Sequence, residues 1–303
     1  MPRPNFFIVG APKCGTTALR QYLLGHPGTF FCEPKEPHYF ATDFPSHRYV
    51  ATEENYIKLF DRAGDACKVI GEASSWYLYS REALPNIRQF DPDAKIVAML
   101  RNPIEMTPSL HAQLLRDFAE SEPDLRRAWD LQEERRDPKL LPKNRNTRYD
   151  PRTFLYGEAC KLGEQVERLL GIFPREQVKI ILFDDFSRDT KAVYESVLSF
   201  LDLPADGRED FAKANVRRDY RSRRAGRLLF AIWSAASRLK SRMGILTTFG
   251  LFKRLERFTM EAKEPGVPDP EFRARLASEF RSDIEVLSRT LGRDLSHWSE
   301  RPD

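Results

Sequence analysis

The stretch that decides the fold is residues 5–24, which read NFFIVGAPKCGTTALRQYLL. The apolar run NFFIV is typical of a short buried strand and ends at Gly10. From Thr16 onward, apolar residues recur at helical spacing, which predicts a helix that begins there. The order is therefore strand, tight loop, helix. Glycines let the N–H groups of such a loop turn inward, and the helix N-terminus adds positive potential, so the loop is suited to bind phosphate.

The loop nearly matches the nucleotide P-loop pattern, but its lysine stands elsewhere. Gly10 is followed by four residues and then by Gly15 and Thr16. An NTP-hydrolysing P-loop carries its lysine directly after the second glycine, whereas this loop carries Lys13 between the two glycines. The lysine would therefore approach the terminal group of a nucleotide from a different side.

The rest of the chain alternates between strand and helix patterns. Apolar runs of strand length occur at 68–71, 95–100 and 178–183, and helical patterns at 54–62, 81–90, 154–170, 190–201 and 270–291, the last ending at Gly292. This alternation predicts an α/β fold: a P-loop-type, mostly parallel β-sheet with helices on both faces and helical C-terminal additions. We find no linker, so residues 1–303 are expected to form one domain. The polar stretch 116–152 is interpreted as a variable insertion or mobile loop.

The loop sequence PKCGTTAL resembles the 5′-phosphosulfate loop of sulfotransferases that use 3′-phosphoadenosine 5′-phosphosulfate (PAPS). The resemblance implies that Lys13 holds the oxygen that bridges the phosphate and the sulfuryl group. It also implies that Gly15, Thr16 and Thr17, with Cys14 in the same loop, bind the 5′-phosphate end of this donor.

A second phosphate site is expected where strand 95–100 ends. Arg101 follows this strand directly, and ligands of parallel sheets bind beyond that edge. Ser109 stands eight residues later, and the pair resembles the 3′-phosphate signature of the same family. A guanidinium can bind phosphate oxygens in a bidentate way. Pro108 interrupts the expected helix, so we expect Thr107 to be an N-cap and Ser109 to lie in the first helical turn.

The candidate base lies in residues 32–40, CEPKEPHYF. This segment resembles the KExHFF-type motif of carbohydrate sulfotransferases, including the heparan sulfate group, in which the glutamate is the catalytic base. The resemblance assigns that role to Glu36, with Lys35 as a substrate-binding neighbour and His38 as a rival base. A carboxylate can take the proton of an acceptor hydroxyl as the new bond forms. Glu72, in GEASSWYL, resembles a family stretch beside the acceptor cleft, and it is either a substrate contact or a buried structural carboxylate.

Positive charge is concentrated in one part of the chain. Residues 217–257 hold twelve Lys or Arg against two acidic residues, a local net charge of +10, which leaves −6 for the rest of a chain whose total is +4. Arg223 and Arg224 stand where sulfotransferases close a basic loop over the 3′-phosphate. The basic, partly apolar segment 217–262 is compatible with a lid, a dimer surface, a membrane-surface helix or a packed core with a solvated basic face.

Three classes of function are therefore weighed. We expect a sulfotransferase with PAPS as donor, 3′,5′-adenosine bisphosphate (PAP) as product, no metal and no nucleic-acid partner, acting on a hydroxyl or amino acceptor that is a small molecule or a glycan. A P-loop kinase is the rival enzyme, although its lysine is shifted and no acidic metal ligand stands out. A non-catalytic binder of anionic ligands is the alternative from another class.

The remaining expectations concern the compartment and the assembly. The four cysteines form no CxxC pair, which favours reduced thiols in a cytoplasm. No apolar leader is apparent, and the longest mostly apolar stretch, 228–236, is far shorter than the roughly 20 residues of a membrane span. We therefore expect a cytoplasmic protein without an anchor. The identity of the acceptor and the oligomeric state stay open.

Overall fold

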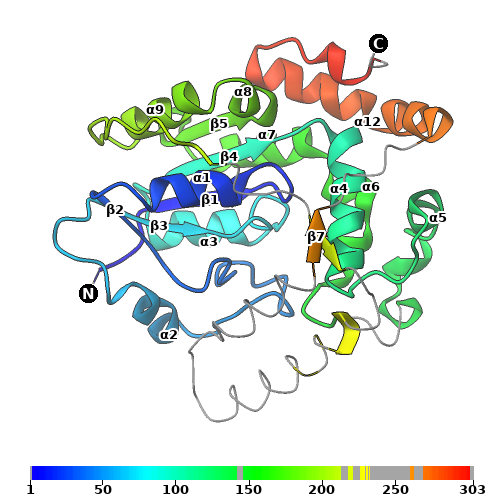
Figure 1. The fold of residues 1–303 in the computed structure, drawn as a ribbon, viewed down its shortest axis with the longest axis horizontal. Helices are drawn as coiled ribbons and strands as arrows, with labels where there is room; N and C mark the ends of the chain where they lie inside the picture. The colour runs from blue at the N-terminus through cyan, green and yellow to red at the C-terminus, as the bar shows by residue number, and fades with distance from the viewer. Residues whose placement is uncertain are drawn as a thin grey trace.

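A five-stranded parallel sheet forms the centre of the molecule (Figure 1). The computed structural model describes residues 2–141, 146–212, 218–220, 226–228, 230, 232, 260–262 and 269–300. The strands are β1 (Phe6–Gly10), β2 (Thr29–Phe31), β3 (Val69–Ala73), β4 (Lys95–Leu100) and β5 (Val178–Leu182). They lie in the order β2-β3-β1-β4-β5, and all neighbouring pairs are parallel. This topology confirms the predicted parallel α/β sheet.

Strand β1 occupies the middle of the sheet because its side chains are apolar throughout. All five of its residues are buried, as expected for a strand that is covered on both faces. Its register pairs Phe6 with Gly71 of β3 on one side and with Lys95 of β4 on the other. The chain continues from β1 to one half of the sheet and later crosses to the other half. The carboxyl end of β1 therefore lies at the switch point where ligands of such sheets bind.

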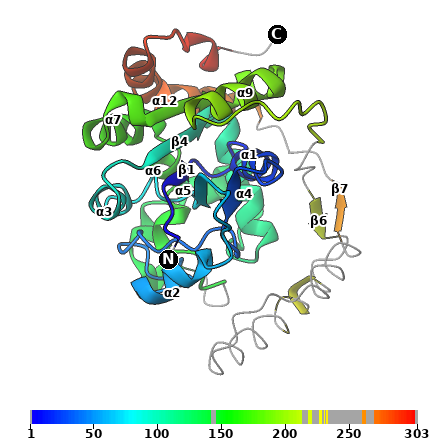
Figure 2. The ribbon, with the colours of Figure 1, turned by 90° about the vertical axis from the view of Figure 1, so that its left-hand side faces the viewer.

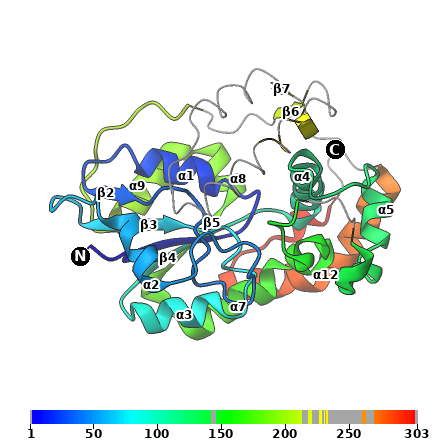
Figure 3. The same cartoon turned by 90° about the horizontal axis from the view of Figure 1, so that it is seen from below.

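Helices cover both faces of the sheet, as predicted. In Figures 2 and 3, one face carries helices α1 and α9 and the other carries α3 and α7, with α12 alongside α7. The helices are α1 (Thr16–Leu23), α2 (Glu53–Ile57), α3 (Ala83–Phe90), α4 (Pro103–Arg116), α5 (Leu125–Asp130), α6 (Tyr156–Ala159), α7 (Leu162–Ile172), α8 (Phe183–Arg188), α9 (Thr190–Phe200) and α12 (Pro270–Leu291).

The bounds predicted for the long C-terminal helix are confirmed. Helix α12 ends at Gly292, which adopts the left-handed conformation (φ 62°) that favours glycine at this position. Its buried Asp283 accepts hydrogen bonds from the N–H groups of Gly163 (2.9 Å) and Glu164 (3.1 Å). A side chain of α12 thereby caps the start of α7.

The prediction of a single helix over 154–170 was wrong. The structure has a 3-10 turn at Pro151–Phe154, then α6 and then α7, with a break at residues 160–161. The break is stable because Asp283 caps the second helix, a contact from the far end of the sequence. Because both short helices bury apolar side chains, the hydrophobic pattern runs through the break and hides it.

The described residues of the segment 116–152 form short helices around a buried ion pair, so the mobile-loop interpretation is not supported there. Glu120 and Arg135 have side chains that are 0% and 4% exposed, and two hydrogen bonds of 2.6 and 3.0 Å join them. The hydroxyl of Tyr156 donates a third bond to Glu120 (2.8 Å). A buried charge needs such partners, so this polar segment has a core of its own.

The basic segment begins and ends in a two-stranded antiparallel ribbon (Figure 1). Strand β6 (Arg218–Tyr220) pairs with β7 (Met260–Ala262), with Asp219 opposite Glu261. The two ends of the segment therefore meet. Arg223 and Arg224, the predicted cover of the 3′-phosphate, lie outside the described residues. Within the described part of the chain, no helix has the length and apolar character needed to span a bilayer.

Candidate active site

The loop between β1 and α1 has the geometry of an anion site. Gly15, the N-cap of α1, has a left-handed backbone (φ 92°), and no side chain caps the first turn of the helix. The N–H groups of that turn point out of the helix end, where they attract negative charge. Lys13 is also left-handed (φ 68°), a backbone conformation that occurs in anion-binding loops. Thr16 and Thr17 begin the helix at this point.

Cys14 packs the loop from beneath. Its side chain is fully buried, its thiol lies 3.9 Å from the sulfur of Met106, and its N–H donates to the carbonyl of Ala11 (3.3 Å). Burial raises the pKa of the Cys14 thiol far above its ordinary value. The Cys14 side chain therefore supports the loop from the core, and its expected contact with the donor stays a prediction.

The second predicted phosphate site lies beside the first. The guanidinium of Arg101 lies 4.7 Å from the ring centroid of Phe183, at the start of α8. A Cβ atom on Gly15 would lie 3.2 Å from the same ring. Phe183 therefore separates the two sites and touches both. Arg101 also pairs with Glu105 (2.9 Å), one turn further along α4.

Helix α4 begins earlier than predicted. Asn102 is its N-cap: the side chain accepts a bond from the N–H two residues ahead (2.9 Å), and Pro103 takes the first helical position. Thr107 is inside the helix, where its hydroxyl donates to the carbonyl of Pro103 (2.8 Å). Pro108 is therefore accommodated within the helix, and Ser109 stands in the second turn instead of the first. The prediction of a cap at Thr107 was wrong because Asn102 and Pro103 form a stronger start signal.

The second half of the site is the carboxylate of Glu36. Three side chains contact it: the ammonium of Lys35, the hydroxyl of Ser75 (3.0 Å) and Nε2 of His38 (3.4 Å). Burial acts to raise the pKa of Glu36, but Lys35 and His38 outweigh it and hold this pKa well below its ordinary value. The side chain is 33% exposed, so a second molecule can reach it. The carboxylate is therefore charged and accessible.

The three predicted catalytic residues share an uncommon backbone conformation. Lys13 (φ 68°), Glu36 (φ 65°) and His38 (φ 49°) are left-handed, and the described residues contain only two further non-glycine residues of this kind, Phe118 and Asp202. Such conformations cost about 1–3 kcal/mol each and persist where the surroundings impose them, often at functional sites. The three residues predicted to be catalytic thus share this conformation, and their catalytic roles stay predictions.

Hydrogen bonds from the core hold the Glu36 segment against the sheet. Arg20 of α1 donates to the carbonyl of Cys32 (2.8 Å) and to the carboxylate of Glu33 (2.8 Å). The N–H of Glu36 donates to the carbonyl of Ala73 (3.1 Å), at the end of β3. The helix that follows the phosphate loop therefore also fixes the start of the base segment.

Glu72 holds the same segment from within the core. Its side chain has no exposed surface, and it accepts hydrogen bonds from the hydroxyls of Tyr56 and Ser74. The Ser74 hydroxyl in turn accepts the N–H of His38 (3.1 Å). Burial raises the pKa of Glu72 above its ordinary value. This geometry favours the structural alternative for Glu72, because no acceptor can reach it without displacing these partners.

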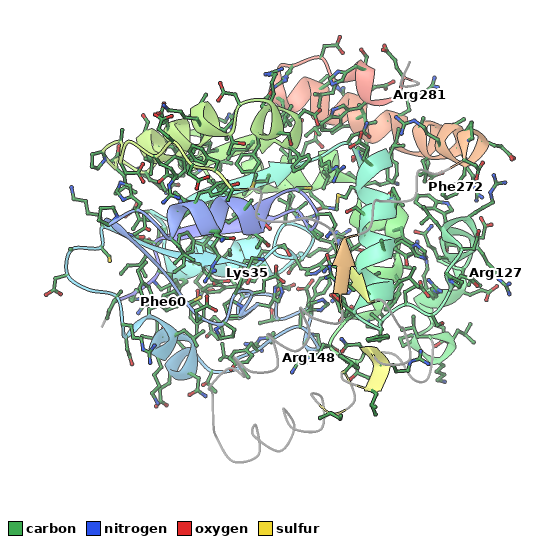
Figure 4. All side chains as sticks on the ribbon, viewed as in Figure 1. Lys35, Phe60, Arg127, Arg148, Phe272 and Arg281 are labelled. Atoms are coloured by element: carbon green, nitrogen blue, oxygen red, sulfur yellow. The ribbon has the colours of Figure 1, made fainter. Side chains whose placement is uncertain are left out.

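The phosphate loop and Glu36 meet at Ser75. A Cβ atom on Gly10 would lie 2.9 Å from the backbone oxygen of Ser75, and the Ser75 hydroxyl contacts Glu36. Figure 4 shows Lys35, the neighbour of Glu36, below α1 and toward the centre of the molecule. The predicted donor site and the predicted base thus lie on two sides of one residue.

Two residues of this site were missed in the sequence. Ser75 stands inside GEASSWYL, and that motif could have indicated it. Phe183 had no signal, because a phenylalanine at the end of an apolar strand looks like any core residue. Its role follows only from the way α8 brings its ring between Gly15 and Arg101.

The acidic pair after β5 is structural. Asp184 accepts a hydrogen bond from the indole of Trp298 (2.7 Å), and Asp185 binds Arg293 (3.0 Å). The carbonyl of Trp298 accepts a bond from the side chain of Asn102 (2.9 Å), so the 3-10 turn Ser296–Trp298 supports the start of α4 beside Arg101. No group of three His, Cys, Asp or Glu side chains in the described chain is arranged to hold a metal ion.

Comparison with known proteins places the chain in a family. A family model described as "Sulfotransferase family" matches residues 4–207. The chain is 27% identical to mouse carbohydrate sulfotransferase 15 over 254 residues, which covers 66% of this chain and 44% of that protein. It is 35% identical to human heparan sulfate glucosamine 3-O-sulfotransferase 6 over 112 residues, which covers 37% of this chain and 31% of that protein.

The chain thus spans less than half the length of the curated relatives it matches. A crystal structure of a sulfotransferase from Alicyclobacillus acidocaldarius is similar over 99% of this chain and 100% of its own, with a TM-score of 0.72 and 28% identity. The family match covers more than half of the chain and includes the phosphate loop, Glu36 and Arg101. The chain therefore belongs to the sulfotransferase family.

Proposed function

We propose that this chain transfers the sulfuryl group of PAPS to a hydroxyl or amino group of a carbohydrate or glycan-like acceptor. The observation that carries the proposal is the meeting of the Lys13 loop and the Glu36 carboxylate at Ser75. A donor loop and an accessible carboxylate base are the two parts that in-line group transfer requires.

The donor is held at two points. The loop N–H groups, with Lys13, Thr16 and Thr17, take the 5′-phosphosulfate end. Arg101 takes the 3′-phosphate through its planar guanidinium, and Ser109 of α4 adds a hydroxyl. The lysines at 13 and 35 supply positive charge to the transferred group, a role that metal ions share in phosphoryl transfer.

The base acts on the acceptor. Glu36 takes the proton of the acceptor hydroxyl or amine while the acceptor atom forms a bond to sulfur. The bond between sulfur and the bridging oxygen of the donor breaks, and its electron pair stays with the phosphate of PAP. Lys13 stabilises the charge that develops on this oxygen. The products are the sulfated acceptor, PAP and one proton on Glu36.

The contact between Lys35 and Glu36 supports a role for Lys35 in controlling the ionisation of the base. Lys35 holds the carboxylate in its charged form while the site contains no donor. The sulfuryl oxygens of a bound donor compete for the same ammonium. As Lys35 turns toward them, the effect of burial prevails and the basicity of Glu36 increases. The same residue therefore couples arrival of the donor to activation of the base.

Two observations support a glycan acceptor. The matched relatives include proteins named for carbohydrate and heparan sulfate glucosamine substrates. The motif around Glu36, PKEPHYF, is the part of this chain that most resembles that group.

The donor site is tested by calorimetric titration with PAP, beside AMP and Mg·ATP. We expect PAP to bind more than about tenfold more tightly than AMP, a difference of about 1.4 kcal/mol. A preference for Mg·ATP would support a kinase instead. Absence of nucleotide binding would leave a module that binds anions without catalysis.

The transfer step is tested with radiolabelled PAPS and a panel of desulfated glycosaminoglycan oligosaccharides. Glu36→Gln should bind PAP as the wild type does and lose at least a hundredfold in kcat, because a neutral amide cannot take the proton. Unchanged turnover in this variant would move the base to His38 or elsewhere.

A further inference from the structure

Two neighbouring histidine rings near Glu36 each contain a buried nitrogen without a hydrogen-bond partner among the described residues. In the described part of the chain, five buried side-chain nitrogens have no hydrogen-bond partner, and Nδ1 of His38 and Nε2 of His47 are two of them. The two rings pack edge to face, with centroids 5.3 Å apart. Because an unpaired buried nitrogen is costly, two of them in neighbouring rings require an explanation.

The other nitrogen of each ring determines where the protons are. Nε2 of His38 faces the charged carboxylate of Glu36, so it carries a proton and Nδ1 is left as an acceptor. Nδ1 of His47 accepts the backbone N–H of Asp150 (3.3 Å), so the proton of His47 is on Nε2. The two nitrogens without partners are therefore one donor and one acceptor.

We propose that His47 is a positioning residue, whose Nε2–H pairs with Nδ1 of His38 through one bridging water and keeps the Nε2–H of His38 directed at Glu36. The inference deepens the proposed function and rests on the role of Glu36 as the base. It describes a chain of three side chains, Glu36, His38 and His47, that ends on the backbone of Asp150.

The surroundings keep His47 neutral, as a donor of this kind must be. Its ring packs against those of Phe44 (5.6 Å) and Trp76 (5.7 Å). Burial is the main cause that lowers the pKa of His47 to about 3. His47 therefore does not compete for the proton that Glu36 removes from the acceptor.

Fixing the His38 tautomer has a consequence for catalysis. If Nδ1 of His38 carried the proton instead, a lone pair on Nε2 would face the Glu36 carboxylate and repel it. The carboxylate would then lose one of its three partners and some of its orientation. Residues that orient a catalytic group in this way are typically worth about 10–100-fold.

The pairing is tested by long-range 1H–15N correlation spectra of histidine side chains, which report the tautomer of each ring. The chain has five histidines, so the signals can be assigned by single substitutions. In the wild type we expect the spectra to show a proton on Nε2 and a hydrogen-bond acceptor at Nδ1 in both His38 and His47. In His47→Phe, which removes the donor and keeps an aromatic ring, His38 should become a mixture of tautomers. A His38 that carries its proton on Nδ1 in the wild type, or is unchanged in His47→Phe, would overturn the inference.

The kinetic test separates positioning from folding. His47→Phe should lower kcat about tenfold and leave KM for PAPS within twofold, whereas His47→Gln retains an N–H donor and should keep kcat within threefold of the wild type. His26→Phe is the control, because His26 is a buried histidine that bonds to the carbonyl of Pro204 instead of lying beside His38. Equal losses in both His47 variants and in the control would overturn the inference.

The proposed function and the positioning role of His47 can be refuted separately. If no glycan receives sulfate from the wild type while the tautomers respond to His47→Phe as expected, the acceptor assignment fails and the pairing stands. If the wild type is active and Glu36→Gln is not, but His47→Phe matches the wild type in both spectra and kcat, the positioning role is refuted alone.

Discussion

Replacing Lys35 by methionine should raise the pKa of Glu36, because two opposing effects act on this carboxylate. Burial favours the neutral acid and the Lys35 ammonium favours the anion. Methionine has a similar length but no charge, so it removes the second effect and leaves the first. The remaining contacts from His38 and Ser75 oppose burial only in part.

The size of the change follows from the geometry. Two unit charges in contact near a protein surface interact by a few kcal/mol at an effective dielectric constant of about 20. The side chains are 33% and 19% exposed, so solvent reduces this value. We expect about 1.5–3 kcal/mol, which corresponds to about one to two pH units in the pKa of Glu36.

The direct assay is a 13C NMR titration of protein labelled at the glutamate carboxyl carbons, with Glu36→Gln to assign the signal. In the wild type the anion should persist as the pH falls well below the ordinary range of a glutamate. In Lys35→Met it should be protonated at a pH about one to two units higher. The acid limb of kcat/KM should move upward by the same amount, because only the anion can accept a proton.

Lys35→Arg is the control, since it keeps the charge and should leave the titration within half a unit. The loss of a cation at the sulfuryl group should also lower kcat in Lys35→Met at all pH values. That loss changes the height of the pH profile and not its midpoint. A midpoint that is the same in Lys35→Met and the wild type would refute the reasoning, because Lys35 would then not control the ionisation of Glu36.

Three further predictions follow from the structure. Glu105→Gln should tighten PAP binding about threefold at low salt, because the carboxylate that competes for Arg101 is removed. The Kd of PAP is measured by calorimetry for the wild type and the variant at low and at high salt, and a ratio of the two Kd values that does not change with salt would contradict this. Gly10→Ala should lower kcat/KM about 100-fold, because the new Cβ would lie 2.9 Å from the carbonyl oxygen of Ser75 and would displace Ser75. Turnover assays measure this loss, and urea unfolding shows whether the fold survives. Glu120→Gln should reduce the free energy of unfolding by about 3–5 kcal/mol, because it leaves the charge of Arg135 buried without its partner; a loss below about 1 kcal/mol in urea unfolding would show that water reaches the pair.

The parts of the fold that were predicted correctly depend on local pattern. Strand β4 and helix α12 have the predicted bounds, because each is a clear run of one periodicity with an end signal such as Gly292. The parts that were missed depend on distant contacts. Strand β2 has only three residues and gains its identity by pairing with β3. The break before α7 requires Asp283, which lies more than a hundred residues away.

The residues of the candidate site likewise fall into those that a local motif indicates and those that depend on distant contacts. Lys13, Glu36 and Arg101 could be predicted because each stands in a motif that resembles a known family. Ser75, Phe183 and His47 were not found, because no spacing rule connects a serine, a phenylalanine or a histidine to a residue on another element. Their contacts arise when the ends of several strands and the loops after them are brought to one edge of the sheet.

The backbone at the site shows why the motif residues need the rest of the fold. A left-handed conformation at a non-glycine residue is unfavourable by itself, so neither the phosphate loop nor the Glu36 segment would hold its shape as a free peptide. The strain is balanced by contacts such as those of Arg20 with Cys32 and of Glu72 through Ser74 with His38. These contacts come from α1 and β3, the same elements that carry the donor loop and flank β1. The predicted donor site and the predicted base are therefore supported by the same elements, and we expect that loosening either support would displace both.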